Sequence, residues 1–473
     1  MNWTVATLLE ATRGELLSGN PATVIRAVST DTRTLGAGDC FVALPGESHD
    51  AHRFIPHAVT LGARAVILSV PLPELAAMAR DVAFIRVSDT QYALGELARS
   101  HRKKFDIPVV AITGSNGKTS TKEMLSAIFE QTLHIVKNKG NFNNLIGLPL
   151  TLLELEPRHQ LAVVEMGINV PGEMARLVEI GCPDTGVITN VQPAHLLGLE
   201  SLDRILEEKT KLWTALADDG LAVVNLDDAR LREFSKKLSC RSVTWSLSDP
   251  GADVRAEGEP RIRKGTTEFG IRFGPGGDII QTSLPVMGPH HAANGLAAAA
   301  AAWGMGISPA VIAAGLAQYQ PVKQRMQAHR LPGGQVLIDD TYNANPASML
   351  AAFQTVALAC GGRPFVAVLG EMRELGPDEV MLHRELGRKL ASFGPSLVIT
   401  CGAIGREIGV GAVEAGLPAA ACHHAESHSE AASILRARMP ADAWVLVKGS
   451  RGITMEEVVE EIIDPAEPVS TRK

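Results

Sequence analysis

Short apolar runs, each followed by a polar or glycine-rich turn, recur along most of the chain. Three of them, at residues 161–166, 185–189 and 221–225, read as continuous apolar strands. Strands of this kind belong to sheets that are covered on both faces. Helical patterns at residues 118–131 and 202–216 alternate with these runs. This alternation predicts a parallel sheet and an α/β fold.

A chain of 473 residues is too long for one hydrophobic core, so its length predicts two to four domains, and the pattern along the chain indicates three. Residues 1–105 predict a small α/β domain that begins with a helix over residues 5–17 and ends with one from 91 to about 104. Its short strands are expected at residues 40–44, 63–68 and 82–87.

Residues 106–318 predict a central parallel-sheet domain. Alternating residues at 253–285, with the turn sequence GPGG at 274–277, indicate added β-hairpins, and a helix is expected over 291–304. After a linker at Gln320–Pro321, residues 319–473 repeat the strand and helix rhythm and predict a Rossmann-like domain. Its strands are expected at residues 336–339, 365–369, 397–400 and 444–447, and a frayed tail at 464–473.

Composition narrows the class of protein. A net charge of −7 argues against a broad nucleic-acid or membrane-surface footprint. No apolar run reaches the roughly 18 residues that span a bilayer, and no signal peptide is visible. The six cysteines are scattered, which is typical of reduced thiols. We expect a soluble, cytoplasmic, monomeric protein that binds no nucleic acid and does not insert into membranes.

Residues 113–120, with the sequence TGSNGKTS, lie between an apolar strand at 107–112 and the helix at 118–131. Such a turn brings backbone N–H groups and the positive end of a helix dipole to one point. Lys118 can neutralise phosphate oxygens, and the Thr119 hydroxyl can bind Mg²⁺. The glycine spacing departs from the commonest Walker form. A tight turn would explain the glycines but not Lys118 and Thr119, so we interpret the segment as a nucleoside triphosphate site.

Polar residues also follow the neighbouring strands, at the edge where open α/β sheets bind ligands. Glu165 ends one strand and is a candidate Mg²⁺ ligand, although a surface charge or a helix cap is an equally ordinary role. His195 follows the next strand, and a lone histidine is more often structural. Asn225–Asp228 is explained by a turn, and Lys209 by itself reads as a solvated helical lysine.

Together these stretches resemble the Mur ligase family, ATP-dependent enzymes that form amide bonds in peptidoglycan precursors. The family's phosphate loop is T-G-[ST]-N-G-K-[ST], which matches residues 113–119. Glu165-Met166-Gly167 resembles its Mg²⁺-binding acid, and residues 190–195 resemble the segment whose histidine is a second metal ligand. Lys209 lies where several relatives carry a carbamylated lysine.

Other strings are more specific within the family. DDTYNANP at 339–346, LGEMRELG at 369–376 and KGSR at 448–451 resemble those of the member that adds D-alanyl-D-alanine to UDP-N-acetylmuramoyl-tripeptide. DTR at 31–33, with GDCFVAL at 38–44, resembles its uridine-binding domain. GNFNN at 140–144 resembles its muramoyl-peptide loop.

The resemblance implies a role for each site residue. Lys118, Lys209 and Arg325 would be catalytic, with Arg325 reaching the phosphates from the third domain, and Thr119, Glu165 and His195 would hold Mg²⁺. ATP would also meet the adenine contact Asn294, the ribose contact Asp340 and the neighbouring Asn345. The complete expected ATP site is Gly114, Ser115, Asn116, Gly117, Lys118, Thr119, Ser120, Asn294, Arg325, Asp340 and Asn345. The expected substrate contacts are Thr32, Arg33, Asn141, Asn143 and Asn144.

The implied reaction forms an acyl phosphate between the tripeptide carboxylate and the γ-phosphate of ATP, which the amine of D-Ala-D-Ala then attacks. The implied domain roles are UDP-substrate binding for residues 1–105, ATP binding for the central P-loop domain, and acceptor and nucleotide contacts for the last domain.

Two departures from the family pattern stand out. G-x-H-N appears as Gly288-Pro289-His290-His291, which puts a direct role of position 291 in doubt, and Leu145 replaces a residue that is often polar. Alternative functions are another Mur-type or folylpolyglutamate-type amide ligase, a P-loop switch or motor ATPase, and a non-catalytic nucleotide-binding scaffold. The strings at 342–346 and 31–44 argue against the first, and the missing N-K-x-D motif argues against a guanine-nucleotide switch.

Overall fold

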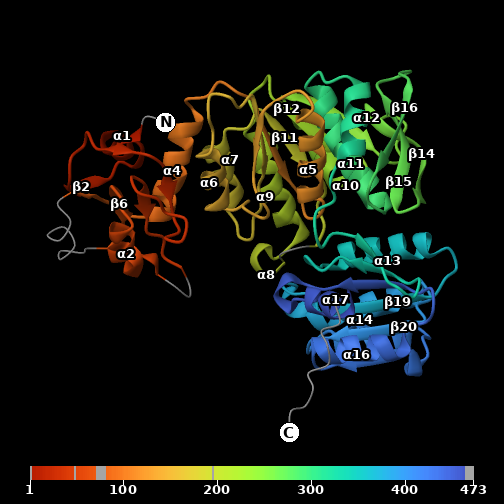
Figure 1. Cartoon of the computed structure of the whole chain (residues 1–473). Coiled ribbons are helices and arrows are strands. Elements are labelled where there is room, and N and C mark those ends of the chain that lie inside the picture. Colours follow the sequence, from red (N-terminus) through yellow and green to blue (C-terminus); the bar gives the residue numbers. More distant parts are fainter. Residues whose placement is uncertain (1–2, 47–49, 71–80, 194–195, 464–473) are drawn as a thin grey trace, which may run out of the picture.

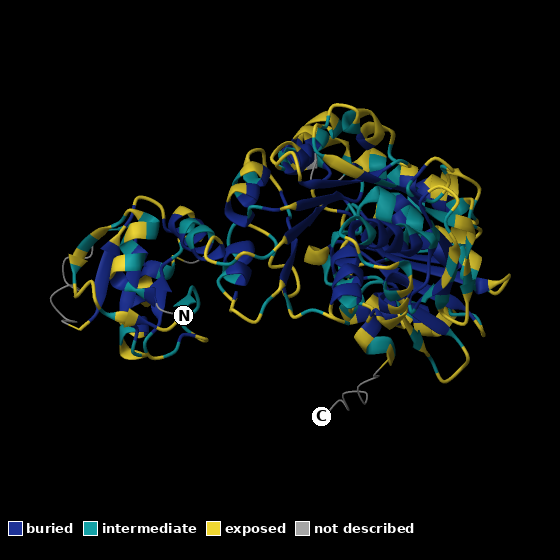
Figure 2. Cartoon of the chain, turned by 90° about the horizontal axis from the view of Figure 1, so that it is seen from above, coloured by how far each residue is buried: buried dark blue, intermediate teal, exposed yellow. Residues whose placement is uncertain are grey.

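A computed structural model describes residues 3–46, 50–70, 81–193 and 196–463 of the chain. Figure 1 shows three α/β bodies that follow one another in sequence, coloured red to orange, orange to green, and teal to blue. The first stands apart at one end, joined through a narrow neck, whereas the third lies against the second (Figures 1 and 2). The expected tail at 464–473 lies outside the described residues.

The first domain contains a five-stranded sheet of order β2-β7-β6-β5-β4. β2 pairs antiparallel with β7, and the other pairs are parallel. The strands are β2 (Glu15–Ser18), β4 (Val28–Ser29), β5 (Cys40–Val42), β6 (Ala65–Leu68) and β7 (Ala83–Arg86), with a separate pair β1 (Trp3–Thr4) and β3 (Val24–Ile25). The helices are α1 (Val5–Thr12), η1 (Ala51–Phe54), α2 (Ile55–Thr60) and α4 (Thr90–Arg102).

The helix expected over residues 5–17 is therefore too long. α1 ends at Thr12 because Arg13 adopts a left-handed conformation, with φ of 53°. The next residue, Gly14, packs so closely that an added Cβ would lie 2.5 Å from the Ile85 side chain. The apolar residues that follow belong to β2, which pairs with β7.

The central domain has a nine-stranded sheet of order β16-β15-β14-β13-β12-β11-β8-β10-β9. It is parallel from β9 to β14 and ends in an antiparallel meander, as expected for the hairpins. The strands are β8 (Val109–Thr113), β9 (Ile135–Lys137), β10 (Leu161–Glu165), β11 (Thr185–Ile188), β12 (Leu221–Asn225), β13 (Arg241–Ser246), β14 (Val254–Arg263), β15 (Thr266–Phe273) and β16 (Ile279–Leu284).

Helices cover both faces of the central sheet. They are α5 (Lys118–Phe129), α6 (Gly147–Leu152), α7 (Glu173–Gly181), α8 (Leu196–Leu199), α9 (Leu202–Thr214), α10 (Ala229–Ser235), α11 (Pro289–Gly304) and α12 (Pro309–Gln318). The alanine run at 297–302 is fully buried in α11, where small side chains allow close packing. Apolar cores form on both sides of the sheet, and one of them continues into the third domain.

The third domain has a six-stranded sheet of order β17-β18-β22-β19-β20-β21, parallel except for edge strand β17. The strands are β17 (Gln327–Arg330), β18 (Val336–Asp339), β19 (Phe365–Gly370), β20 (Leu397–Cys401), β21 (Cys422–Ala425) and β22 (Trp444–Lys448). The helices are α13 (Pro346–Cys360), η2 (Gly376–Asp378), α14 (Glu379–Ala391), α15 (Arg406–Glu414), η3 (Ala419–Ala421), α16 (His428–Arg438), η4 (Arg451–Ile453) and α17 (Glu456–Ile463).

The strand order locates the site. β8 lies between β10 and β11, so the chain leaves its carboxyl end at a point where the strand order reverses. A crevice at such a switch point is the usual ligand site of an open α/β sheet. α13 lies on the side of the third domain that faces the central domain (Figure 1).

Candidate active site

The loop after β8 contains two glycines that no other residue could replace without strain. Gly114 has φ of 146°, and a Cβ there would lie 1.8 Å from Oγ1 of Thr189. Gly117 has φ of 83° immediately before α5, and its Cβ would lie 2.2 Å from Oδ1 of Asn294. Glycine tolerates both the left-handed backbone and the close approach. The loop is thus shaped to present backbone at the start of a buried helix.

The segment after β11 fixes this loop in place. The Ser115 backbone N–H donates to the Asn190 carbonyl at 3.0 Å, and the Ser115 hydroxyl donates to the Gln192 carbonyl at 2.7 Å. The Asn116 carbonyl accepts from Oγ1 of Thr189 at 2.6 Å. The loop is therefore held from a neighbouring strand as well as by its own helix.

Two lysines, the half-buried Lys118 and the buried Lys209, meet at one carbonyl of the loop. Nζ of Lys118 donates to the Gly114 carbonyl at 2.9 Å, and Nζ of Lys209, on α9, donates to the same oxygen at 3.1 Å. Burial lowers the pKa of Lys118, an effect opposed by Glu165 and reinforced by Arg325. Burial, together with the charge of Lys118, lowers the pKa of Lys209 well below its usual value. Lys209 is only 2% exposed, so its interpretation as a solvated lysine is wrong.

An oxygen-rich cluster lies beside Lys118. Oγ1 of Thr119 donates to Oε2 of Glu165 at 2.8 Å, and Nδ2 of Asn143 donates to Oε1 of Glu165 at 2.7 Å. Asn138 holds the Glu165 backbone, since its Oδ1 accepts from the Glu165 N–H at 2.7 Å. From the third domain, Nη2 of Arg325 reaches Oγ1 of Thr119 at 3.1 Å.

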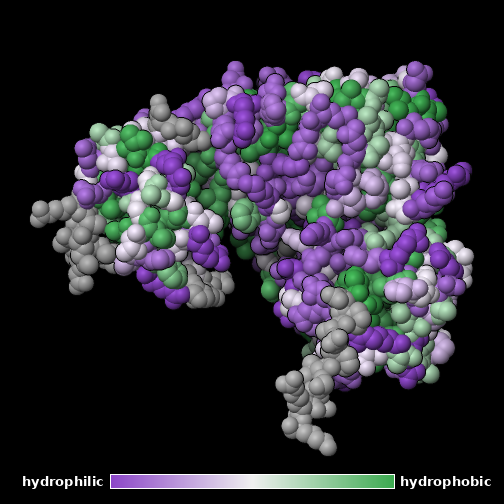
Figure 3. Space-filling view, in the orientation of Figure 1, coloured by the Kyte–Doolittle hydropathy of each residue, from purple (hydrophilic) through white to green (hydrophobic). Residues whose placement is uncertain are grey.

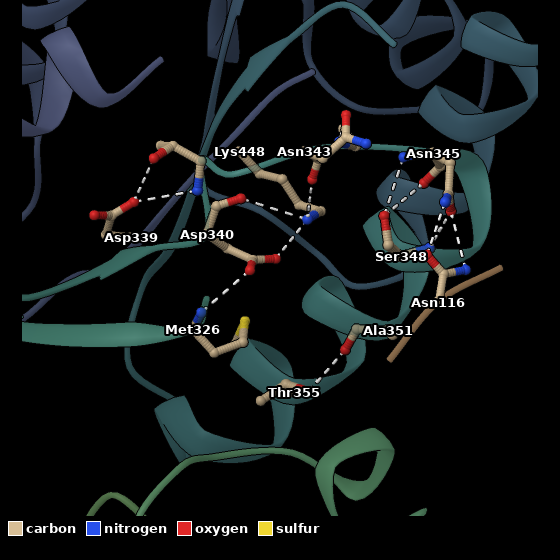
Figure 4. Close-up of polar contacts among 12 residues, drawn as sticks. Asn116, Met326, Asp339, Asp340, Asn343, Asn345, Ser348, Ala351, Thr355 and Lys448 are labelled. Atoms are coloured by element: carbon tan, nitrogen blue, oxygen red, sulfur yellow. Dashed lines mark hydrogen bonds and ion pairs between the residues drawn. The ribbon is translucent and has the colours of Figure 1, made fainter. Parts of the chain in front are cut away.

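The third domain contributes a second polar group (Figure 4). Nζ of Lys448, at the end of β22, donates to Oδ2 of Asp340 at 2.6 Å and to the Asn343 carbonyl at 2.8 Å. Oδ1 of Asp340 accepts from the Met326 N–H at 3.1 Å. Both carboxylate oxygens of Asp340 are therefore oriented by the protein.

These groups line one cavity of about 910 Å³ between the central and third domains. In Figure 3, hydrophilic side chains gather along the visible boundary between these domains. The predicted site residues that line the cavity are Ser115, Asn116, Gly117, Lys118, Thr119, Ser120, Asn141, Asn143, Asn144, Glu165, Asn294, Arg325, Asp340 and Asn345.

Four other predicted residues do not line this cavity. Gly114 belongs to the loop but does not line the cavity, and Lys209 donates to its carbonyl. Thr32 and Arg33 lie in the first domain, where Arg33 pairs with Asp31 at 2.6 Å. The remaining candidate, His195, lies outside the described residues. Within the described residues, no three His, Cys, Asp or Glu side chains gather as a metal-binding group.

Sequence reasoning missed several residues of the site. Lys448 was noted only as part of a string, and Gln192 had no recognised signal. His290 and His291, noted in the sequence only as a departure from the family pattern, lie in the first turn of α11 with their ring centroids 4.2 Å apart, and both line the cavity. Burial lowers the pKa of His290 to about 4 and that of His291 well below its usual value. Neither ring nitrogen of His291 has a partner among the described residues.

Comparison with known proteins identifies the family. Residues 24–102 match the model described as Mur ligase family, catalytic domain, residues 112–302 match the Mur ligase middle domain, and residues 324–451 match the Mur ligase, glutamate ligase domain. The chain belongs to the Mur ligase family.

Among Mur ligases with assigned names, the chain is 37% identical to the UDP-N-acetylmuramoyl-tripeptide--D-alanyl-D-alanine ligase of Escherichia coli, over 97% of this chain and 98% of the relative. It is 34% identical to the ligase of the same name from Bacillus subtilis, over 98% of each chain.

Solved Mur ligase structures show the same architecture. A crystal structure of MurF from Acinetobacter baumannii superposes with a TM-score of 0.88 at 32% identity, covering 98% of this chain and 99% of that one. MurF from Thermotoga maritima in complex with ADP gives 0.82 at 26% identity, covering 92% and 97%. The three-domain α/β fold expected from the sequence is confirmed. Among the described residues, no helix is both long and apolar enough to cross a bilayer.

Proposed function

We propose that this Mur ligase joins D-alanyl-D-alanine to UDP-N-acetylmuramoyl-tripeptide at the expense of ATP, as the names of its full-length relatives indicate. The observation that carries the proposal is the contact of Arg325, from the third domain, with Thr119 at the start of α5. It brings a cation from one domain to the phosphate loop of another, which suits a reaction between two anionic substrates.

Each domain has a proposed role. Residues 1–105 would bind the UDP end of the muramoyl substrate, with Thr32 and Arg33 as contacts. Residues 106–318 would bind ATP, and residues 319–473 would provide acceptor and nucleotide contacts. A cytoplasmic location and a monomeric state stay predictions.

The cavity suits ATP. Phosphates would lie on the backbone of residues 114–120 at the N-terminus of α5, where the helix dipole and N–H groups favour anions. Asp340 would accept hydrogen bonds from the ribose, since Lys448 and Met326 already orient its two oxygens. Asn294, packed against Gly117, would contact adenine, and Asn345 would lie nearby.

The residues beside the loop also fit Mg²⁺. Hard divalent cations prefer oxygen ligands, and Glu165 and Thr119 offer a carboxylate and a hydroxyl 2.8 Å apart. His195 would be a further ligand. A bound Mg²⁺ would supply neutralisation of the charge on the transferred phosphoryl group.

The proposed chemistry has two steps. A carboxylate oxygen of the tripeptide forms a bond to the γ-phosphorus as the bond to ADP breaks. The amine of D-Ala-D-Ala then bonds to the acyl carbon, loses a proton and displaces phosphate. Lys118 and Arg325 would offset the repulsion between carboxylate and phosphate, so positioning and electrostatics do most of the work.

Lys209 would carry a carbamate. The modification requires a neutral amine, whose nitrogen bonds to the carbon of CO₂ and loses a proton. A pKa lowered by burial and by Lys118 makes that neutral form available. The added carboxylate would then place a negative charge close to Lys118.

Mass spectrometry tests the proposal. Purified protein incubated with ATP, UDP-N-acetylmuramoyl-tripeptide and D-Ala-D-Ala is expected to yield the pentapeptide, ADP and phosphate. Parallel reactions with single amino acids, and with glutamate plus a folate, separate this function from other amide ligases of the family. Steady ADP release without carboxylate or amine would favour a switch or motor ATPase and overturn the proposal.

A further inference from the structure

Asn345 performs two functions at the start of α13. Its Oδ1 accepts from the Ser348 N–H at 2.9 Å, while Oγ of Ser348 accepts from the Asn345 N–H at 3.0 Å. These reciprocal bonds form a capping box that satisfies backbone donors at the helix start. The capping function uses only the oxygen of the Asn345 amide and leaves its nitrogen available.

That nitrogen crosses to the other domain. Nδ2 of Asn345 donates to Oδ1 of Asn116, in the phosphate loop, at 2.7 Å, and Nδ2 of Asn116 lies 3.4 Å from Oδ1 of Asn345 (Figure 4). Nδ2 of Asn116 also donates to Oε1 of Gln192 at 2.7 Å. Gln192 therefore favours the amide orientation in which the oxygen of Asn116 faces Asn345.

Both ends of this contact are anchored in their own domains. The Asn116 backbone is held by Thr189 and by Asn190, whose Oδ1 accepts from the Asn116 N–H at 3.0 Å. On the other side, Lys448 binds Asp340 and the Asn343 carbonyl, which fixes the segment that leads to Asn345. A shift of the third domain would therefore pull on the phosphate loop through this amide pair, in addition to the contact of Arg325 with Thr119 at the start of α5.

We propose that Asn116 and Asn345 form an interdomain latch that positions the phosphate loop when the third domain is docked. The inference rests on the proposed function, because the latch acts on the site of phosphoryl transfer. It assigns the Asn345 nitrogen to Asn116 rather than to the nucleotide. In the latch, Asn345 and Asn116 are positioning residues, and their contact stabilises the docked arrangement of the third domain.

Asn345→Ser separates the two functions of Asn345. Serine is as good an N-cap as asparagine, so α13 keeps its cap, but its side chain is too short to reach Asn116. Loss of a hydrogen-bonded pair of this kind is expected to lower kcat about five- to tenfold. The KM for the muramoyl tripeptide and the melting temperature should stay near those of the wild type.

Phe353→Leu is the matched control on the same helix. Phe353 is fully buried and packs against Phe393, with ring centroids 6.1 Å apart, on the apolar side of α13. This variant should lower the melting temperature while kcat stays within about twofold of the wild type. A kcat loss in Phe353→Leu as large as in Asn345→Ser would attribute the effect to helix stability and overturn the latch.

A double-variant cycle decides whether the partner is Asn116. In the Asn116→Ala background the latch is already absent, so adding Asn345→Ser should change kcat by less than about twofold. An undiminished five- to tenfold loss in that background would show that Asn345 acts on the nucleotide, and would overturn the proposal. Absence of pentapeptide product from the wild type would instead refute the proposed function.

Discussion

At the scale of single residues, the least expected feature of the site is that two lysines share one carbonyl oxygen. Lys118 and Lys209 both donate to the Gly114 carbonyl, and because Lys209 is buried and Lys118 half-buried, water screens the two groups less than it would at the surface. The charge of Lys118 adds to the effect of burial in disfavouring the protonated form of Lys209, whose pKa lies well below its usual value. An added negative charge would relieve this repulsion, which is the physical reason to expect a carbamate on Lys209.

We expect Lys209→Ala to lower the ligation rate about 100-fold, the scale of losing one electrostatic group from an active site. Short carboxylates such as acetate should restore part of the rate, since they can occupy the space of the carbamate. Measured rates with and without added carboxylate check this. Lys209→Ala activity equal to the wild type would discard the role.

His290 makes stability depend on pH. Its pKa in the folded protein is about 4, against an ordinary value of 6.5, because burial disfavours the charged ring. The unfolded chain therefore binds the proton more readily, so this stability is complete above pH 6.5 and is lost as pH falls towards 4. The expected loss between pH 7 and pH 5 is about 2 kcal/mol. Denaturant unfolding of wild type and His290→Gln at both values measures it, and equal pH dependence in the two proteins would contradict the assignment.

At the scale of elements, the phosphate loop shows how a short segment comes to require glycine at a particular position. Gly117 combines a left-handed backbone with contact against Asn294, so two separate penalties oppose any side chain. Strain alone is insufficient to define a site, because many surface turns have the same conformation. The contact distinguishes this glycine from those in open turns.

Gly117→Ala should therefore weaken ADP binding at least about tenfold, because the loop or Asn294 must move. Gly258→Ala is the matched control: φ is 77° there, but an added Cβ meets nothing within 4 Å. It should bind ADP as the wild type does, with only a small loss of stability. Calorimetric titration of both variants measures the difference, and equal affinities would show that the contact with Asn294 has no influence.

Elements with strong local patterns were predictable. The buried runs of β8, β10, β11 and β12 read as strands because both faces of the sheet are covered. By contrast, no sequence pattern predicted β9, β13, β17, β21 or α12. β17 and β21 are edge strands with polar residues, such as Cys422–Ala425, and depend on pairing with a neighbour. α12 is an apolar helix packed against α5 and β16 and has little periodicity of its own.

The same distinction applies to the site. Loop residues such as Lys118 were recognisable because their neighbours in the chain already form the binding element. The burial of Lys209 and the bond from Lys448 to Asp340 depend on residues about 100 positions away, so composition and spacing could not reveal them. Resemblance to a family pointed to their positions, and the structure adds their partners.

At the scale of the whole molecule, the arrangement of the domains decides whether the site is complete. Glu165 and Lys118 come from the central domain, whereas Arg325 and Asp340 come from the third. Arg325 is held by stacking on Tyr342, with its guanidinium carbon 4.2 Å from the ring centroid. Its Nη2 reaches Oγ1 of Thr119, whereas its Nε is buried and has no partner among the described residues.

Arg325→Ala should therefore affect the reacting complex more than nucleotide binding. We expect kcat to fall about 100- to 1,000-fold, since removing a cation from a developing charge has effects of this size. ADP affinity should change less than about threefold, because ADP lacks the γ-phosphate that Arg325 would contact.

Arg325→Lys is the informative companion. It keeps the positive charge but loses the planar guanidinium, which stacks on Tyr342 and is able to donate to two oxygens at once. A rate between those of the wild type and Arg325→Ala would show that both charge and geometry contribute. Rapid-quench measurement of acyl phosphate formation isolates the first step, and an unchanged rate of that step in Arg325→Ala would remove the third domain from phosphoryl transfer. Docking would then serve only to close the cavity around a reaction carried out by the central domain.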